Sequence, residues 1–457
     1  MSEKLNEHAV QWYNQAVMSQ DTDPQISYKL VTSALELEPT LAEGWHYIAE
    51  MNKNNHFYAS AIGCFRRALE TDSKNGKLWT NLSHALYESG KIEEAKLAAQ
   101  TALSLDDTLS NAWLAMSMIQ SVEGDIHSSV KSARRSYEID PTPITEFAMG
   151  FAYLHARDLK QGLRWFEAKL PYRMANHLSF PWPRWSGEDL TDQTIFIMAD
   201  QGMGDTLDYL RFIPLVAQRC KTVILQIQGE LMRVAQMMLS DHSNIEYSVL
   251  NAPFPDANFW VPITSIPVAL DMGSEAIENT PQLSVPEWQQ PAQFASWKTP
   301  KRKLHVGVAW AGAPGNDIDK YRSMRIDDFL EFCQVPGVQL YSFQVGQRSQ
   351  DVHITGSIAL IKDMTIFVRD VADTVGFLRE LDLVIAVESF LPHLCNAIGK
   401  EVWMPYSHLG GDWRAGRKGQ RPVWHPHTKF FHQTKEGKWG PVVENIVSAL
   451  RKRVANA

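Results

Sequence analysis

Apolar and small residues recur every 34 positions over the first third of the chain. Tryptophan stands at Trp45, Trp79 and Trp113. In the same register are the small residues Ala34, Ala68, Ala102 and Ser136 and the turn formers Pro39, Ser73, Asp107 and Pro141. Between these markers the apolar spacing is helical, and pairs such as Ser89-Gly90 interrupt it. The pattern predicts stacked antiparallel helix pairs, a helical solenoid with the tryptophans and small residues inside.

This repeat resembles the tetratricopeptide repeat. On that resemblance, four units occupy residues 8–143 and a degenerate fifth helix pair continues to about residue 172, so that residues 1–172 form the solenoid. The resemblance implies a concave groove that docks an extended peptide or another protein. The residues themselves do not identify that partner.

A different pattern follows a segment rich in aromatic residues and proline, residues 178–188, which cannot continue a helix. Residues 173–192 are therefore predicted to be a linker or docking segment. Beyond them, β-rich runs at 194–199 and 222–227 alternate with helical runs at 206–218 and 230–240. This alternation predicts a parallel sheet covered by helices, which we assign to residues 193–300.

A similar series follows the polar stretch Pro286–Lys303. Its apolar runs lie at 304–310, 339–345, 383–387 and 402–406. An amphipathic helix from about Gly440 to Val454 is expected to brace one half of the structure against the other. We predict a second doubly wound domain over residues 301–457, a hinge near residue 300, and a cleft at the carboxyl ends of the strands.

Composition narrows the function. The chain has 44 Lys and Arg against 52 Asp and Glu, and this net charge of −8 disfavours general nucleic-acid binding. The four cysteines are far apart, which indicates neither a zinc site nor a disulfide framework. The N-terminus lacks an apolar signal segment, and no run approaches about 18 apolar residues. We expect a cytoplasmic protein without a transmembrane segment.

The first motif that can carry chemistry joins an apolar strand to a helix. Gly202 and Gly204 would let backbone amides approach an anionic ligand. Asp205 follows them, and taken alone it is more readily explained as a helix N-cap than as a catalytic group.

Two further motifs lie in the second series. A buried strand opens into a loop with Gly312, followed by the cation of Arg322, which suits a diphosphate as well as it suits a solvated surface loop. Glu388 and Ser389 end another strand, and His393 lies on the next helix, pointing to the same cleft. A lone histidine of this kind is more often a hydrogen-bonded core residue.

A glycine-rich basic loop, residues 410–418, contains Asp412, Trp413 and Arg414. Local positive charge in an acidic protein indicates a region that receives an anionic ligand or substrate.

Together with Pro183–Glu188, Arg211–Pro214 and Trp424, these motifs resemble those of bacterial proteins in which tetratricopeptide repeats are fused to a heptosyltransferase-like glycosyltransferase domain. The resemblance covers nearly the whole chain, and the layout is also similar to that of O-linked N-acetylglucosamine transferases. It implies an α/β GT-B fold, two Rossmann-like domains facing a cleft. The first domain would lie on the acceptor side, and the second would bind the nucleotide sugar.

The resemblance also implies a reaction: inverting transfer of a sugar from a nucleotide-diphosphate donor to a hydroxyl group, without a metal ion or other cofactor. Asp205 would be the base that deprotonates the acceptor. The donor and its phosphates would contact Gly202, Gly204, Gly312, Arg322, Gln344, Glu388, Ser389 and His393. Asp412, Trp413 and Arg414 would form a substrate loop.

One departure from the family bears on activity. Where the family usually has an aspartate followed by Thr or Ser and a small residue, this chain has Glu388-Ser389-Phe390, which is longer and bulkier beside the expected phosphate. A non-catalytic scaffold with a degenerate transferase domain is therefore one alternative.

The acceptor is a second open question. A protein chosen by the repeats, flagellin-like or another surface protein, is the first expectation. The alternative is a saccharide or lipid-linked glycan, with the repeats used for assembly. The sequence leaves open the nucleotide, the sugar, the acceptor and any homo-oligomer.

Overall fold

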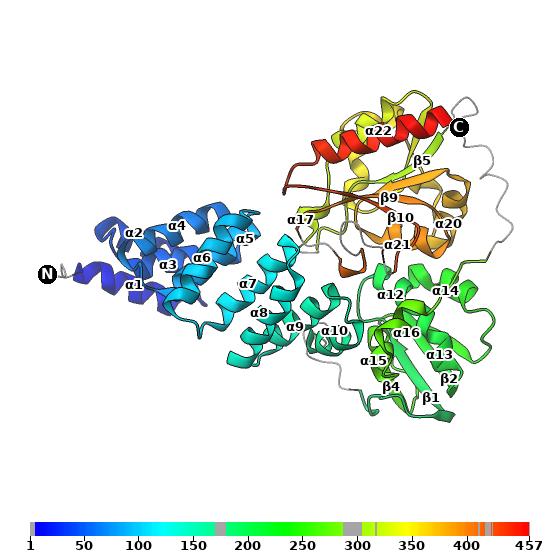
Figure 1. Ribbon diagram of the computed structural model, residues 1–457, viewed down its shortest axis with the longest axis horizontal. Helices are drawn as coiled ribbons and strands as arrows, with labels where there is room; N and C mark the ends of the chain where they lie inside the picture. Colours follow the sequence, from blue (N-terminus) through cyan, green and yellow to red (C-terminus); the bar gives the residue numbers. More distant parts are fainter. Residues whose placement is uncertain are drawn as a thin grey trace. The chain divides into compact units, whose positions relative to one another are not determined.

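The computed structural model describes residues 5–169, 180–286, 304–315, 318–409, 412–415, 422 and 424–456. The chain divides into two compact units, Met1–Ala156 and Arg157–Ala457 (Figure 1). The predicted hinge near residue 300 lies outside the described residues, as do residues 173–179 of the predicted linker and parts of the basic loop.

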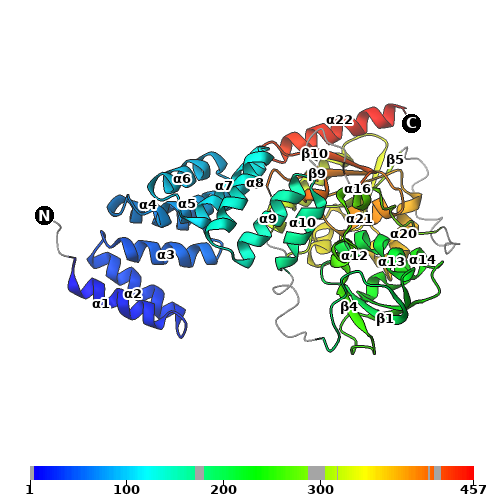
Figure 2. The same cartoon turned by 60° about the horizontal axis from the view of Figure 1, so that its bottom comes forward.

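The first unit is an all-helical solenoid (Figure 2). Its helices are α1 (Glu7–Ser19), α2 (Pro24–Leu37), α3 (Ala42–Asn54), α4 (Tyr58–Thr71), α5 (Gly76–Glu88), α6 (Ile92–Leu105), α7 (Ser110–Glu123), α8 (Ile126–Ile139) and α9 (Pro143–His155). Local sequence sets several of their starts. Asn6, Asp23 and Asn75 accept hydrogen bonds from the first backbone N–H groups of α1, α2 and α5.

The 34-residue period has a structural counterpart in one repeated hydrogen bond. The indole N–H groups of Trp45, Trp79 and Trp113 donate to the carbonyl oxygens of Pro39, Ser73 and Asp107, at 2.8, 2.9 and 2.9 Å. The small residues of the register, Ala34, Ala68, Ala102 and Ser136, have no solvent exposure. The predicted solenoid is confirmed, since each repeat closes its turn with the tryptophan and packs through its small residues.

The structure divides the predicted fifth helix pair between the two units. Helix α9 ends the first unit, whereas α10 (Leu159–Phe166) belongs to the second. There α10 contacts α15 (Ile266–Ala269) and α16 (Ser274–Asn279). Arg164 and Lys160 of α10 form ion pairs with Asp271, between those two helices. The unit boundary therefore lies after Ala156 instead of near residue 172.

The second unit contains two parallel sheets, which confirms the predicted α/β region. We call residues 180–286 the first lobe and residues 304–456 the second lobe. The first lobe has strand order β3-β2-β1-β4, every neighbour parallel. The strands are β1 (Leu190–Met198), β2 (Cys220–Ile227), β3 (Ile245–Val249) and β4 (Phe259–Pro262).

The helices of the first lobe are shorter than predicted. The run 206–218 is divided into α12 (Met203–Tyr209), a 3-10 turn and α13 (Ile213–Ala217), with Pro214 in the first turn of α13. Helix α14 (Met232–Met238) follows β2.

The aromatic segment after residue 179 packs on the first sheet. Residues 183–185 pair with Trp260 of β4 through backbone hydrogen bonds. The ring of Phe180 stacks on that of Trp260 with centroids 4.0 Å apart. Trp185 is buried, and its indole N–H donates to the Glu188 carbonyl oxygen at 2.9 Å. The described part of the predicted linker is thus docked.

The second lobe has strand order β10-β9-β8-β5-β6-β7, again all parallel. The strands are β5 (Leu304–Ala309), β6 (Val338–Ser342), β7 (Ile361–Asp363), β8 (Leu383–Ala386), β9 (Val402–Tyr406) and β10 (Thr428–His432). The main helices are α17 (Asp319–Arg322), α18 (Ile326–Cys333), α19 (Asp351–Ile354), α20 (Val371–Glu380), α21 (Phe390–Ala397) and α22 (Gly440–Asn456). Helix α22 packs on α18, β9 and β10, which all belong to the second lobe. None of the described helices combines the length and apolarity needed to cross a membrane.

Candidate functional site

The carboxyl ends of the two sheets are joined by helices α12 and α21. Helix α12 follows β1, α21 follows β8, and the two helices are in contact. Gly204 lies in the first turn of α12. A Cβ atom there would come within 2.7 Å of Cδ2 of the His393 ring on α21. Gly204 was predicted to admit a ligand, and it admits a side chain of the other lobe.

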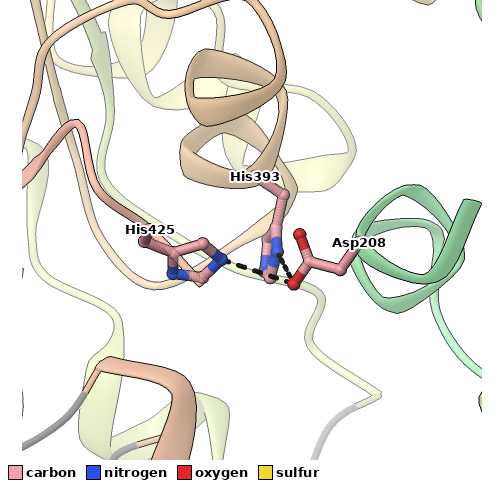
Figure 3. A group of neighbouring side chains, drawn as sticks. All are labelled: Asp208, His393 and His425. Carbon is pink, nitrogen blue, oxygen red and sulfur yellow. Dashed lines mark hydrogen bonds and ion pairs between the residues drawn. The ribbon is translucent and has the colours of Figure 1, made fainter. Parts of the chain in front are cut away.

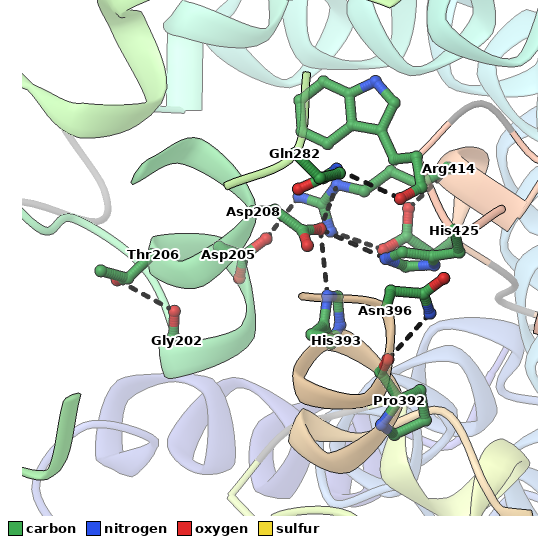
Figure 4. A network of polar contacts seen from close by, with 12 residues as sticks. Gly202, Asp205, Thr206, Asp208, Gln282, Pro392, His393, Asn396, Arg414 and His425 are labelled. Atoms are coloured by element: carbon green, nitrogen blue, oxygen red, sulfur yellow. Dashed lines mark hydrogen bonds and ion pairs between the residues drawn. The ribbon is translucent and has the colours of Figure 1, made fainter. Parts of the chain in front are cut away.

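Asp205 does not cap α12. The N-cap position is Gly202, and no side chain caps the helix. The Asp205 carboxylate instead accepts a hydrogen bond of 2.5 Å from Nη2 of Arg414, which lies after β9 (Figure 4). This contact joins residues that are 209 positions apart in the chain. The N-cap explanation of Asp205 is therefore wrong.

Arg414 connects three aspartates. Besides Asp205, its Nη1 donates to Asp412 at 2.7 Å, and its Nε lies 3.7 Å from Oδ2 of Asp208. Burial would lower the pKa of Arg414, but the charges of Asp412, Asp205 and Asp208 outweigh it and hold the pKa well above its ordinary value. Arg414 was predicted to lie in a substrate loop, and in the structure its guanidinium is a buried link between the lobes.

Asp208, which the sequence analysis missed, lies at the centre of the contact between the lobes. Its Oδ2 is 3.0 Å from Nδ1 of His393 and 3.4 Å from Nε2 of His425 (Figure 3). Only 3% of Asp208 is exposed. Asp208 follows Asp205 by three positions on one helix, a spacing that places both side chains on the same face and could have indicated it.

Asp208 and His393 are the closest pair in this group, and each stabilises the charge of the other. Burial alone would raise the pKa of Asp208, but His393 and His425 hold it well below its ordinary value. Burial alone would lower the pKa of His393, but the charge of Asp208 outweighs burial and raises it. The carboxylate form of Asp208 and the cationic form of His393 therefore favour each other.

Arg211 and Trp424, which the sequence analysis also singled out, form a buried stack beside this group. The Arg211 guanidinium carbon is 4.0 Å from the centre of the Trp424 ring. Arg211 also donates to the carbonyl oxygen of Ile277 at 3.0 Å. Burial lowers the pKa of Arg211 to about 10. Since its contacts are a ring and a carbonyl group, Arg211 holds the lobes in register.

Arg322 and Glu388 meet at the carboxyl ends of β5 and β8. Nη1 of Arg322 is 3.5 Å from Oε1 of Glu388, and its Nε donates to Asp319 at 3.3 Å. A Cβ atom on Gly312 would overlap Asp319 and Arg322, so this glycine makes room for their pair. Burial first, and then the charge of Asp412, raises the pKa of Glu388 to about 7.

Three other predicted residues have local partners. Gln344 is buried, and its side-chain oxygen accepts from the N–H groups of Trp310 and Ala311 at 2.9 and 2.8 Å. The Ser389 hydroxyl donates to the Val387 carbonyl oxygen at 3.0 Å. Gln344 therefore secures the loop after β5. Trp413 packs its ring 5.2 Å from that of Trp424.

Asp208, His393 and His425 have the donor atoms of a metal site, because their three ligand atoms lie within 4.8 Å of one another. The guanidinium of Arg414 argues against one, since its Nε is 3.7 Å from the same carboxylate oxygen. Repulsion at about 4 Å is on the order of 4 kcal/mol per unit of metal charge at an effective dielectric constant near 20. We interpret the group as a network of hydrogen bonds and ion pairs.

Comparison with known proteins supports the repeat. Residues 76–108 match the family model described as tetratricopeptide repeat, so the chain carries tetratricopeptide repeats. Protein FlbA of Caulobacter vibrioides is 20% identical over 473 residues, covering 95% of this chain and 76% of FlbA. The STIP1 homolog of Dictyostelium discoideum is 34% identical over 85 residues, covering 19% of this chain and 15% of that protein.

Among solved structures, the crystal structure of MamA is 14% identical, covers 35% of this chain and 95% of MamA, and has a TM-score of 0.31. YrrB, described as a TPR protein with an unusual peptide-binding site, is 19% identical. The match covers 36% of this chain and 87% of the YrrB chain, with a TM-score of 0.31.

The stability of the second unit should depend on pH through Asp208 and His393. The depressed pKa of Asp208 contributes stability that is present above about pH 3.9, the ordinary value, and is lost as pH falls through the folded value. The raised pKa of His393 contributes stability that is complete below about pH 6.5 and is lost as pH rises through the folded value. The difference in melting temperature between the native chain and Asp208→Asn should be greatest between these limits. A difference that does not vary with pH would contradict the pairing.

Metal removal should leave the protein unchanged. Because Arg414 occupies the side of Asp208 that a cation would need, we expect EDTA to leave the melting temperature where it is. A matched measurement with added Zn²⁺ should give the same result for the native chain and for His425→Asn. Stabilisation by Zn²⁺ that this substitution removes would show that the three residues bind a metal.

Proposed function

We propose that this protein is a glycosyltransferase that moves a sugar from a nucleotide-diphosphate donor to an acceptor hydroxyl group, with inversion and without a metal ion. One observation carries the proposal: residues after the carboxyl ends of strands in both parallel sheets are in contact. Asp205 follows β1 and pairs with Arg414, which follows β9. Parallel α/β sheets bind ligands at their carboxyl ends, so a donor held by the second lobe would lie beside the first.

The chemistry asks for a base on the acceptor side. Asp205 is about a quarter exposed in its side chain, whereas Asp208 on the same helix is 3% exposed. The Arg414 contact fixes one carboxylate oxygen of Asp205, through Oδ1. The other oxygen is the one that would accept the proton as the hydroxyl oxygen attacks the anomeric carbon. The family's GT-B assignment, with an acceptor-side and a donor-side Rossmann-like domain, is part of this proposal.

The donor side carries the remaining predicted contacts. Gly312, Arg322, Glu388, Ser389 and His393 all lie at or after the carboxyl ends of β5 and β8. His393 also contacts the first lobe, through its hydrogen bond with Asp208. We propose that the diphosphate binds along this edge of the second sheet.

Besides the Glu388-Ser389-Phe390 departure, the pairing of Arg322 supports the non-catalytic alternative. Its guanidinium already contacts two carboxylates, Asp319 and Glu388. A diphosphate would have to compete with both, which weakens donor binding. The pKa of Glu388, about 7, eases this competition, because a protonated Glu388 leaves Arg322 with one anionic partner.

The repeats would select the acceptor. Tetratricopeptide solenoids form an extended concave surface suited to an unfolded or extended peptide. We therefore propose a protein acceptor, with a saccharide or lipid-linked glycan as the alternative.

Asp205→Asn should lower turnover about 100-fold or more, because the amide cannot accept the proton, while the binding of nucleoside diphosphate changes little. The measurement is release of nucleoside diphosphate from a panel of uridine, guanosine, adenosine and thymidine diphosphate sugars, with calorimetric titration of the matching nucleotides. Asp192→Asn, an exposed position on β1, is the matched control. Native turnover in Asp205→Asn would exclude this base. Absence of both binding and turnover in the native chain would favour the scaffold.

A chain that begins at Arg157 keeps α10 with its partners and tests acceptor selection. We expect it to hydrolyse the donor at the native rate and to lose more than about 90% of transfer of radiolabelled sugar into protein, because the docking surface is gone. Labelled protein, glycan and lipid fractions of a cell extract are counted separately. Native transfer into the glycan or lipid fraction would establish the alternative acceptor.

A further inference from the structure

Two cations near the carboxyl ends of the strands are already held by carboxylates. Arg414 donates to Asp205 and Asp412, and Arg322 contacts Asp319 and Glu388. The proposed reaction produces a diphosphate leaving group whose charge needs a hydrogen-bond donor in the absence of a metal ion. The structure contains a third candidate for this role, with a different arrangement of partners.

His393 has one ring nitrogen engaged and one remaining. Nδ1 is 3.0 Å from Asp208, and a Cβ atom on Gly204 would come within 2.7 Å of Cδ2, 2.9 Å of Nε2 and 3.1 Å of Cγ of the ring. Within the described part of the chain, Nε2 forms no hydrogen bond, and 9% of the His393 surface is exposed to solvent. The ring is thus held by the Asp208 carboxylate at Nδ1 and by Gly204 along the Cγ–Cδ2–Nε2 side, and its second N–H has no acceptor among the described residues.

We propose that Asp208 is a positioning residue: it holds His393 so that the Nε2–H group donates a hydrogen bond to the leaving diphosphate of the donor. The inference deepens the proposed function and rests on it. Asp208 acts through His393 and does not itself touch the substrate. The pair joins the two lobes, so His393 reaches this orientation only when α12 and α21 are in contact.

The protons and electrons of the step balance. The acceptor oxygen bonds to the anomeric carbon, and the bond from that carbon to the phosphate oxygen breaks, leaving its electron pair on the oxygen. The hydroxyl proton goes to Asp205, and His393 keeps its own proton while it donates the hydrogen bond. In neutral His393 the remaining proton stays on Nδ1 facing Asp208, and Nε2 presents a lone pair that a phosphate oxygen repels.

The charges around the imidazole favour the cation. The titratable groups that face His393 are the acidic Asp205, Asp208, Glu388 and Asp412 and the basic Arg414 and His425. Arg414 is the shared ion-pair partner of Asp205 and Asp412, and Arg322 is that of Glu388. Burial opposes protonation of His393, but the adjacent charge of Asp208 raises its pKa above the ordinary value. Donation from Nε2 should therefore fail as pH rises through the raised pKa of His393.

The first experiment needs no enzymatic activity. Nitrogen-15 NMR of the imidazoles in the full chain follows the titration of His393, assigned by its loss in His393→Gln. The midpoint should lie above that of an exposed histidine, and Asp208→Asn should bring it down to or below that reference. Asp363→Asn is the matched control, because Asp363 lies 3.7 Å from a different histidine, His353. A native midpoint at or below the reference, or one unmoved by Asp208→Asn, overturns the positioning role.

The second experiment measures binding of the uridine, guanosine, adenosine and thymidine diphosphates. His393→Gln should weaken the best of these by about 10-fold, the usual effect of losing a charge-assisted hydrogen bond. In the native chain the affinity should fall as pH rises through the NMR midpoint, and in Asp208→Asn this fall should begin at lower pH. Equal pH dependence in the two chains overturns the inference.

The two results separate the inference from the function on which it rests. If no diphosphate binds, the proposed function fails and the phosphate role of His393 fails with it. The titration then still shows whether Asp208 holds the histidine as a cation. If diphosphate binds and the donor turns over, but His393→Gln changes neither, only the inference is overturned. A circular dichroism spectrum of each variant ensures that a folded chain is compared.

Discussion

The structure of the second unit depends on a buried group of charges where the carboxyl ends of two parallel sheets meet. Arg414 of one lobe holds Asp205 of the other and reaches toward Asp208, and His393 pairs with Asp208. Charges so placed are tolerated only when each has a partner, and removing one partner of a buried pair costs about 3–5 kcal/mol. While the lobes are in contact, the buried Asp208 therefore depends on cationic side chains that the other lobe supplies. Several residues that the sequence analysis assigned to ligand binding contact the other lobe in the structure.

Much of the fold could be read from local patterns. The solenoid was predictable because its period is local: a tryptophan, its turn and its small residues all lie within 34 positions. The strands with long apolar runs were predictable for a similar reason. Strands β3, β7 and β10 were missed, since β7 has three residues and β3 and β10 lack an uninterrupted apolar run. Strand β4 was also missed; it has four residues and ends in a proline. Local apolar content is a weak guide to an edge strand.

The site was harder to predict than the fold. Gly204, Asp205 and His393 were named correctly as members of one region, but the sequence did not show what they touch. Asp205 and Arg414 are 209 positions apart, and Asp208 and His393 are 185 apart. Pairing over such distances is decided by the docking of two lobes, which no local spacing encodes. Asp208 has no motif of its own, and its importance arises from two imidazoles supplied by another part of the chain.

The indole-to-turn hydrogen bond of the repeats bears on how this chain arose. Each bond joins a tryptophan to the carbonyl group six residues before it, so a duplication or deletion of a whole repeat keeps the two partners together. Duplicating or deleting 34 residues would keep every such bond intact and leave a solenoid one helix pair longer or shorter. Evolution can therefore lengthen the recognition surface in whole steps without rebuilding the rest of the protein.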